Sequence, residues 1–219
     1  MRPRAILFDL DGTLVDSAPD LAGAANQLRQ QHGLEALPLE TYRPRAGSGA
    51  RGMLAAGFGL SADAPVYEVM RQAFLALYEQ RLLQSTTVFE AIPSLLARLE
   101  ELDCAWGVVT NKALYLAEPM LIGLDLRHRL SVLVCGDSTP HLKPHPAPLL
   151  EAARRLGHAA DQCIYVGDDE RDMRAGRSAG MKTLAAAWGY LGPDSKIEDW
   201  GADAVLQSPG DLLNWLDLP

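Results

Sequence analysis

The sequence predicts an α/β protein, in which a parallel sheet is covered by helices and a helical segment is inserted after the first strand. Two observations lead to this fold class. Short apolar runs of strand length alternate with segments whose apolar residues recur at helical spacing. One long interval, residues 16–87, has helical periodicity but no convincing strand. We therefore expect a core of residues 1–15 and 88–219 and an inserted helical domain of residues 16–87.

Six apolar runs are expected to form the sheet. They are Ala5–Phe8, Trp106–Thr110, Ser131–Cys135, Cys163–Gly167, Thr183–Ala187 and Ala204–Leu206. Two of the covering helices show a clear apolar stripe. The first spans Pro93–Asp103, with Leu95, Leu96, Leu99 and Leu102 on one face; the second spans Pro148–Leu156, with Leu149, Leu150, Ala153 and Leu156, and ends at Gly157.

The inserted interval contains two predicted helices and a loop. Leu21, Ala25 and Leu28 mark the first helix, and Val66, Val69, Met70, Phe74, Leu77 and Tyr78 mark the second. Between them, the glycine-containing stretch 43–51 carries several arginines and is expected to be a flexible, cationic loop.

Composition limits the class of partner. The chain has 219 residues, of which 48% are hydrophobic and 22% charged, as in ordinary globular domains. A net charge of -8 argues against nucleic acid or an anionic membrane surface as the main partner. The three scattered cysteines lie in or beside apolar segments, and no apolar run is long enough to span a bilayer, so we expect a cytoplasmic protein with buried thiols. The sequence carries no signal of oligomeric state.

Two aspartates follow the first predicted strand. Asp9 and Asp11 are separated by one residue and lead into a Gly-Thr turn, at the strand end where open α/β sheets place their ligands. Two carboxylates so close repel each other unless a cation or a shared proton intervenes. The pair therefore indicates either a hard metal ion such as Mg²⁺ or a division into an ionised nucleophile and a proton carrier.

Three further segments place polar side chains at the same predicted edge. Thr110 and Asn111 end the second core strand, Lys143 precedes a proline in a turn, and an acidic cluster that includes Asp168, Asp169 and Asp172 follows the fourth strand and opens a helix. Together they supply a nucleophilic carboxylate, a hydroxyl donor, a cation and further carboxylates that can bind a metal. Phosphoryl transfer from a phosphomonoester requires these groups.

These four segments resemble, in order, the motifs of the haloacid dehalogenase superfamily of phosphatases. The matching stretches are FDLDGTLVDS, VVTN, LKP and VGDDERD. The resemblance covers essentially the full chain and implies a Rossmann-like core with an all-helical type 1 cap. Within the superfamily, the chain looks most like the phosphoglycolate phosphatases and their relatives that act on N-acetylmuramic acid 6-phosphate.

The resemblance also implies roles for individual residues. Asp9 would attack phosphorus and form an aspartyl-phosphate, and Asp11 would protonate the leaving alkoxide and then activate water. Thr110 and Lys143 would neutralise the phosphoryl oxygens. The cofactor would be Mg²⁺, held by Asp9, the main-chain carbonyl of Asp11, and Asp168. Asp172 is favoured over Asp169 as a support of the metal's water shell, although the extra carboxylate of Asp169 leaves that choice open.

The expected substrate is a small phosphorylated metabolite bearing a carboxylate, best matched by 2-phosphoglycolate, with N-acetylmuramic acid 6-phosphate as the alternative. Expected substrate contacts are Asn111 in the core and Arg45, Ser48, Gly49 and Arg51 in the cap. A phosphohexomutase with the same cap type and a phosphorylation-switch receiver module remain as further alternatives. The receiver is disfavoured because such modules are much shorter and take their acceptor from a middle strand.

Overall fold

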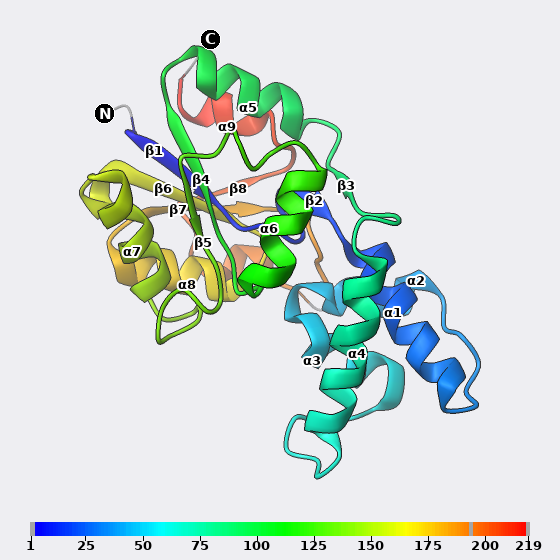
Figure 1. Ribbon diagram of the computed structural model, residues 1–219. Helices are drawn as coiled ribbons and strands as arrows, with labels where there is room; N and C mark the ends of the chain where they lie inside the picture. Colours follow the sequence, from blue (N-terminus) through cyan, green and yellow to red (C-terminus); the bar gives the residue numbers. More distant parts are fainter. Residues whose placement is uncertain (1–2, 193–194, 218–219) are drawn as a thin grey trace. The chain divides into compact units, whose positions relative to one another are not determined.

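The computed structural model describes residues 3–192 and 195–217 (Figure 1). The chain divides into two compact units. The first contains Met1–Val15 and Val88–Pro219, and the second contains Asp16–Thr87. The short strands β2 (Val15–Asp16) and β3 (Thr87–Val88) pair with each other where the chain passes from one unit to the other.

The first unit is built on a six-stranded parallel sheet with the strand order β5-β4-β1-β6-β7-β8. The strands are β1 (Ala5–Phe8), β4 (Ala105–Val109), β5 (Val132–Val134), β6 (Cys163–Gly167), β7 (Lys182–Ala186) and β8 (Ala204–Leu206). The predicted fold class is confirmed, and each of the six expected strands is present within one residue of its expected ends. The fully buried β1 lies between β4 and β6, which explains why its residues are continuously apolar.

Helices cover both faces of this sheet. They are α5 (Ile92–Glu101), α6 (Leu114–Gly123), α7 (Ala147–Leu156), α8 (Glu170–Ala179) and α9 (Asp211–Trp215), with 3₁₀ turns at Ala160–Gln162 and Ile197–Trp200. Helices α7 and α8 cover one face and α5 the other (Figure 1). Under α7 and α8, Leu7 and Tyr165 from the strands share a core with Leu149 and Ala175 from the helices.

One residue of the predicted α7 stripe is misplaced. Leu149 is buried, but Leu150 is 44% exposed, so its assignment to the buried face is wrong. Neighbouring residues on a helix point about 100° apart, and the sheet covers only the side that carries Leu149, Ala152 and Ala153.

The second unit is helical. It contains α1 (Ala18–Gln31), α2 (Leu39–Tyr42), a 3₁₀ helix η1 (Arg43–Ser48), α3 (Gly49–Phe58) and α4 (Tyr67–Arg81), with α1 packed against α4. The expectation of a flexible loop at 43–51 is wrong, because this stretch forms η1 and the start of α3. Two glycines make that compact turn possible: Gly49 has a φ of 54°, and a Cβ on Gly52 would lie 2.0 Å from the Arg45 carbonyl oxygen.

The predicted apolar stripe of α4 is buried only over the second half of the helix. Phe74, Leu77 and Tyr78 are buried, whereas Val66 and Val69 are 56% and 71% exposed. Periodicity correctly identifies the side of the helix but does not reveal where its packing partners end.

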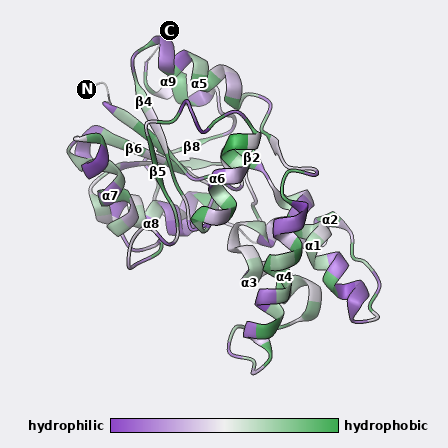
Figure 2. Cartoon of the chain, viewed as in Figure 1, coloured by the Kyte–Doolittle hydropathy of each residue, from purple (hydrophilic) through white to green (hydrophobic). Residues whose placement is uncertain are grey.

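Helix α6 is apolar over most of its length (Figure 2), yet within residues 3–192 and 195–217 no helix is both long and apolar enough to cross a bilayer.

A buried carboxylate links the two ends of the second unit. Asp20 on α1 is fully buried and accepts hydrogen bonds from the backbone N–H groups of Ser85 and Thr86 at 2.9–3.0 Å, and from the Thr86 hydroxyl at 2.7 Å. The segment that leads into β3 is thereby tied to the first turn of α1.

We expect Asp20→Ala to destabilise the protein by about 2–4 kcal/mol, because the donors of Ser85 and of the buried Thr86 would lose their acceptor. Urea unfolding followed by circular dichroism would measure the change. Glu79→Ala, at an exposed position of α4, is the matched control and should change the free energy of unfolding by less than about 0.5 kcal/mol. Equal effects of the two substitutions would contradict the assignment.

Candidate active site

The first strand delivers Asp9 to the carboxyl edge of the sheet. The backbone N–H of Asp9 donates to the carbonyl of Val166 on β6 at 2.9 Å, so Asp9 leaves β1 beside the end of the neighbouring strand. Asp168 follows β6 directly. The register of β1 and β6, in which Phe8 pairs with Val166, therefore brings the two carboxylates to the same edge.

Asp168 is buried and oriented by two neutral donors. The Thr13 hydroxyl donates to one of its oxygens at 2.8 Å, and the backbone N–H of Tyr190 donates to the other at 2.9 Å. Gly12 makes this approach possible, because it has a φ of 86° and a Cβ there would lie 2.1 Å from the Asp168 carboxylate. The Gly-Thr turn after Asp11 is thus shaped to accommodate Asp168.

Asp169 and Asp172, at the start of α8, make different contacts. Asp169 is its N-cap; its carboxylate accepts from the backbone N–H of Arg171 and from both Nε and Nη2 of the Arg171 guanidinium, all at 2.8 Å. Burial would raise the pKa of Asp169, but Arg171 holds it below its ordinary value. Asp172 lies three residues later, and its carboxylate accepts from the Asp169 N–H at 3.2 Å.

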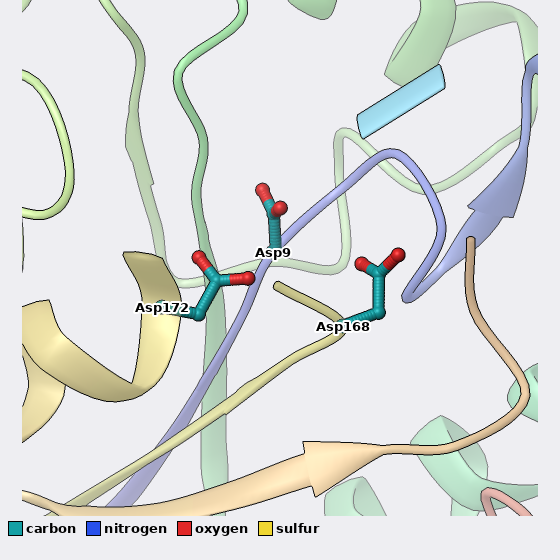
Figure 3. Close-up of side chains that lie close together, drawn as sticks. All are labelled: Asp9, Asp168 and Asp172. Carbon is teal, nitrogen blue, oxygen red and sulfur yellow. The ribbon is translucent and has the colours of Figure 1, made fainter. Parts of the chain in front are cut away.

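The structure brings Asp9, Asp168 and Asp172 together (Figure 3). One carboxylate oxygen of each lies within 4.8 Å of the other two. Within the described residues, this is the one group of three or more carboxylate, thiol or imidazole side chains with metal-binding spacing. Asp169 is paired with Arg171 outside this group, and the geometry therefore favours Asp172 over Asp169 as a support of a metal site.

Lys143 joins these carboxylates from a neighbouring loop. Its side chain is 3% exposed, and its Nζ lies 2.9 Å from Asp9 Oδ1 and 2.7 Å from Asp172 Oδ1. The ammonium also donates to the hydroxyl of Tyr165 at 2.7 Å and to the carbonyl of Val109 at 3.1 Å. A buried ammonium is thus held by two carboxylates and two neutral oxygens.

The local electrostatics follow from burial and from this charge pattern. Burial, followed by repulsion from Asp9 and Asp172, raises the pKa of Asp168 well above its ordinary value. Burial also raises the pKa of Asp172, and Asp9 and Asp169 add to that rise while Lys143 opposes it. For Lys143, burial acts against the charged form, but Asp172 and Asp9 raise its pKa above the ordinary lysine value. The cluster thus holds three acidic groups and one cation.

The second core strand supplies Thr110, Asn111 and Lys112. Thr110 is buried beside the end of β5, since its N–H donates to the Val134 carbonyl at 2.9 Å. The Asn111 amide donates to the carbonyl of Lys143 at 3.0 Å and accepts from its N–H at 2.9 Å. In this structure, the side chain of Asn111 therefore fixes the loop that carries Lys143.

A second lysine of the site, Lys112, pairs with Asp11. Both of its carboxylate oxygens accept from Lys112 Nζ, at 2.9 and 3.1 Å. Asp11 is thereby directed toward Lys112, and its carboxylate is not a member of the three-carboxylate cluster.

The four residues expected to contact substrate from the cap all belong to the second unit. Arg45 and Ser48 lie on η1, and Gly49 and Arg51 lie in the first turn of α3. Arg45, Ser48 and Arg51 are exposed and Gly49 is partly exposed. The four expected residues thus lie within seven positions of the second unit, across the junction of η1 and α3, while Asp9, Asp168, Asp172 and Lys143 form the cluster of the first unit.

Sequence reasoning missed three residues that shape the site: Thr13, Lys112 and Tyr165. Each lies inside or beside one of the four motifs, so its position in the sequence indicates that it is near the site. The roles were not readable because each depends on a partner distant in sequence, such as the pairing of Thr13 with Asp168.

Comparisons with known proteins agree with this geometry. The model of the family described as haloacid dehalogenase-like hydrolase matches residues 6–186. A phosphoglycolate phosphatase of Xanthomonas campestris is 47% identical over 211 residues, covering 96% of this chain and 95% of the relative. An N-acetylmuramic acid 6-phosphate phosphatase of Pseudomonas aeruginosa is 42% identical over 217 residues, covering 99% and 96%. A crystal structure from Haemophilus somnus, described as a predicted phosphoglycolate phosphatase, superposes with a TM-score of 0.86 at 26% identity and covers 98% of each chain.

We expect Lys143→Met to destabilise the protein by about 3–5 kcal/mol at pH 7 in the presence of a chelator, because the buried Asp172 and the partly exposed Asp9 would lose their shared cation. Urea unfolding would measure the loss. Lys196→Met, which removes an exposed ammonium, is the control and should change the free energy of unfolding by less than about 0.5 kcal/mol. A loss of under 1 kcal/mol for Lys143→Met would show that the ammonium does not hold the cluster together.

Proposed function

The chain belongs to the haloacid dehalogenase-like hydrolase family, and on that premise we propose that it is a phosphomonoester hydrolase that acts on 2-phosphoglycolate through an aspartyl-phosphate at Asp9. The observation that carries this proposal is the cluster of Asp9, Asp168 and Asp172, in which Asp9 and Asp172 pair with the ammonium of Lys143. A partly accessible carboxylate, 15% exposed, lies beside a buried cation at the carboxyl edge of the sheet. This arrangement suits a nucleophile that attacks an anionic phosphoryl group.

The donor set fits Mg²⁺. Three acidic groups face one ammonium in a largely buried cluster, so carboxylates outnumber cations, and a divalent cation would offset this excess. Burial is the main cause of the raised pKa of Asp168, and repulsion from Asp9 and Asp172 adds to it. Hard oxygen donors are the ligands that Mg²⁺ prefers. We infer that Asp9, the main-chain carbonyl of Asp11, and Asp168 would hold the ion, with Asp172 supporting the shell; when bound, it would draw negative charge from the phosphoryl oxygens.

In the first half of the reaction, a carboxylate oxygen of Asp9 bonds to phosphorus as the bond from phosphorus to the substrate oxygen breaks. The departing alkoxide takes a proton from Asp11 and leaves as an alcohol. Lys143 and the hydroxyl of Thr110 stabilise the phosphoryl oxygens as their charge rearranges. Because Lys143 also contacts Asp9, it holds the nucleophile near the group it attacks.

In the second half, water attacks phosphorus and releases inorganic phosphate. Asp11, now a carboxylate, accepts the proton of that water, and the bond between Asp9 and phosphorus breaks to restore the Asp9 carboxylate. One residue therefore acts first as acid and then as base, so each turnover returns the site to its starting state.

The choice of substrate rests on the relatives and on the exposed arginines of the second unit. Both kinds of phosphatase among the relatives are named for substrates that carry a carboxylate beside the phosphate. The 47% relative favours 2-phosphoglycolate, and the 42% relative makes N-acetylmuramic acid 6-phosphate the second candidate. We propose that Arg45 and Arg51, with Ser48 and Gly49, recognise the end of the substrate that carries the carboxylate. The three buried thiols are in keeping with a cytoplasmic enzyme.

The proposed nucleophile is tested with Asp9→Asn. The amide keeps the shape of the carboxylate but loses its nucleophilicity, so turnover of 2-phosphoglycolate should fall by at least about 10³-fold while the fold is retained. Phosphate release would be measured for the wild type and the variant, each with Mg²⁺ and with excess chelator, alongside circular dichroism. Retention of more than a few per cent of activity by the variant would remove Asp9 from this role, and full activity of the wild type in chelator would remove Mg²⁺.

The proposed specificity is tested with Arg51→Ala. Loss of a charge-assisted hydrogen bond should lower kcat/KM for the preferred carboxylate-bearing substrate roughly 10- to 100-fold. The measurements would compare 2-phosphoglycolate, N-acetylmuramic acid 6-phosphate and p-nitrophenyl phosphate, which lacks a carboxylate and should be unaffected. Arg71→Ala, at another arginine of the second unit, is the control. Equal losses on all three substrates would assign Arg51 to the fold rather than to recognition.

A further inference from the structure

Lys112 is an almost buried lysine at the proposed site. Its side chain is 8% exposed. Its backbone is fixed on both sides, because its N–H donates to the Thr110 hydroxyl at 3.1 Å and its carbonyl accepts from the N–H of Gly136 at 2.9 Å. An ammonium withdrawn from water requires a counter-charge.

The counter-charge is Asp11. Lys112 Nζ contacts both carboxylate oxygens of Asp11, at 2.9 and 3.1 Å, and the Asp11 side chain is itself only 15% exposed. Rotation about the last bond of an aspartate side chain is soft, so an unrestrained carboxylate samples many orientations. A cation that contacts both oxygens restricts that rotation.

Two other cations near the site pair with different carboxylates. Lys143 lies between Asp9 and Asp172, and Arg171 is bound to Asp169 through two of its nitrogens. Lys112, in contrast, contacts the carboxylate to which the proposed mechanism assigns proton transfer.

We propose that Lys112 is a positioning residue that fixes the carboxylate of Asp11 for proton exchange with the leaving oxygen. This inference rests on the proposed function. Proton transfer requires the acid to lie within about 2.6–3.2 Å of the oxygen it protonates, and displacement by about 1 Å can cost as much as 10²-fold in rate. Lys112 would act on the reaction through Asp11, whose carboxylate it contacts.

The first test compares leaving groups in single-turnover measurements. Lys112→Met should slow phosphoryl transfer from 2-phosphoglycolate about 10-fold, because its alkoxide needs the acid. Transfer from p-nitrophenyl phosphate should slow less than about 3-fold, because its phenolate leaves without a proton. The KM for each substrate should stay within about 2-fold. Equal losses on both substrates, or a loss confined to KM, would assign Lys112 to phosphate or substrate binding and overturn the proposal.

The second test asks whether Lys112 acts through Asp11. In an Asp11→Asn background, adding Lys112→Met should change the single-turnover rate on 2-phosphoglycolate by less than about 2-fold, because the group that Lys112 positions is already lost. A further 10-fold loss in the double variant would show that Lys112 acts independently, and would overturn the proposal.

Controls separate this inference from folding and from the function itself. Lys182→Met removes the ammonium of a pair with Asp203, whose contact distance is 2.6 Å, at the opposite end of β7 from the site, and it should leave both rates unchanged. If Lys112→Met does not fold, as judged by thermal unfolding, Lys112→Gln retains a shorter donor and should show the same dependence on leaving group. A wild-type enzyme that hydrolyses neither substrate would contradict the proposed function, whereas a wild type active on both with an unselective Lys112 variant would contradict only this inference.

Discussion

The ion pairs of Lys143 with Asp9 and Asp172 are the interaction on which the site depends. Parallel strands bring Asp9 and Asp168 to one edge of the sheet, and the first turn of α8 adds Asp172, so the topology alone concentrates negative charge in a largely buried place. Carboxylates held this close repel one another, and the repulsion adds to the effect of burial in raising the pKa of Asp168 and of Asp172. The buried ammonium offsets that repulsion, and Asn111 fixes the loop that supplies it through two hydrogen bonds to the Lys143 backbone.

Close packing around the carboxylates explains why glycines recur beside them. A Cβ on Gly12, Gly167 or Gly189 would lie within 2.1–2.3 Å of an atom of Asp168 or Asp172. Gly167 and Gly189 have no positive φ, so a side chain is excluded there by lack of space and not by backbone conformation. The glycines let backbone approach the acidic side chains closely enough for donors such as the Tyr190 N–H to reach Asp168 at 2.9 Å. Carboxylate orientation and backbone path are therefore set together.

Much of the core was predictable because its signals are local. An apolar run such as Ala5–Phe8 identifies a strand buried on both faces, and the polar residue that follows it must lie at the carboxyl edge. Burial at element ends was not predictable in the same way: Leu150 and Val69 continue an apolar pattern but project where no neighbour covers them. The site shows the same limit. Asp9 and Lys143 could be chosen by type and position, whereas the pairing of Lys112 with Asp11 spans 101 residues of sequence and appears only when β1 and β4 are neighbours.

The two lysines of the site illustrate how one kind of side chain serves two purposes. Lys143 lies between two carboxylates of the cluster, so its charge is shared and its main effect is to offset the repulsion between them. Lys112 is directed at a single carboxylate and contacts both of its oxygens, so its main effect is on orientation. The proposed nucleophile, Asp9, must carry a negative charge when it attacks. The proposed acid and base, Asp11, must instead keep its position while its charge changes. Separate cations for Asp9 and Asp11 allow each requirement to be met without compromising the other.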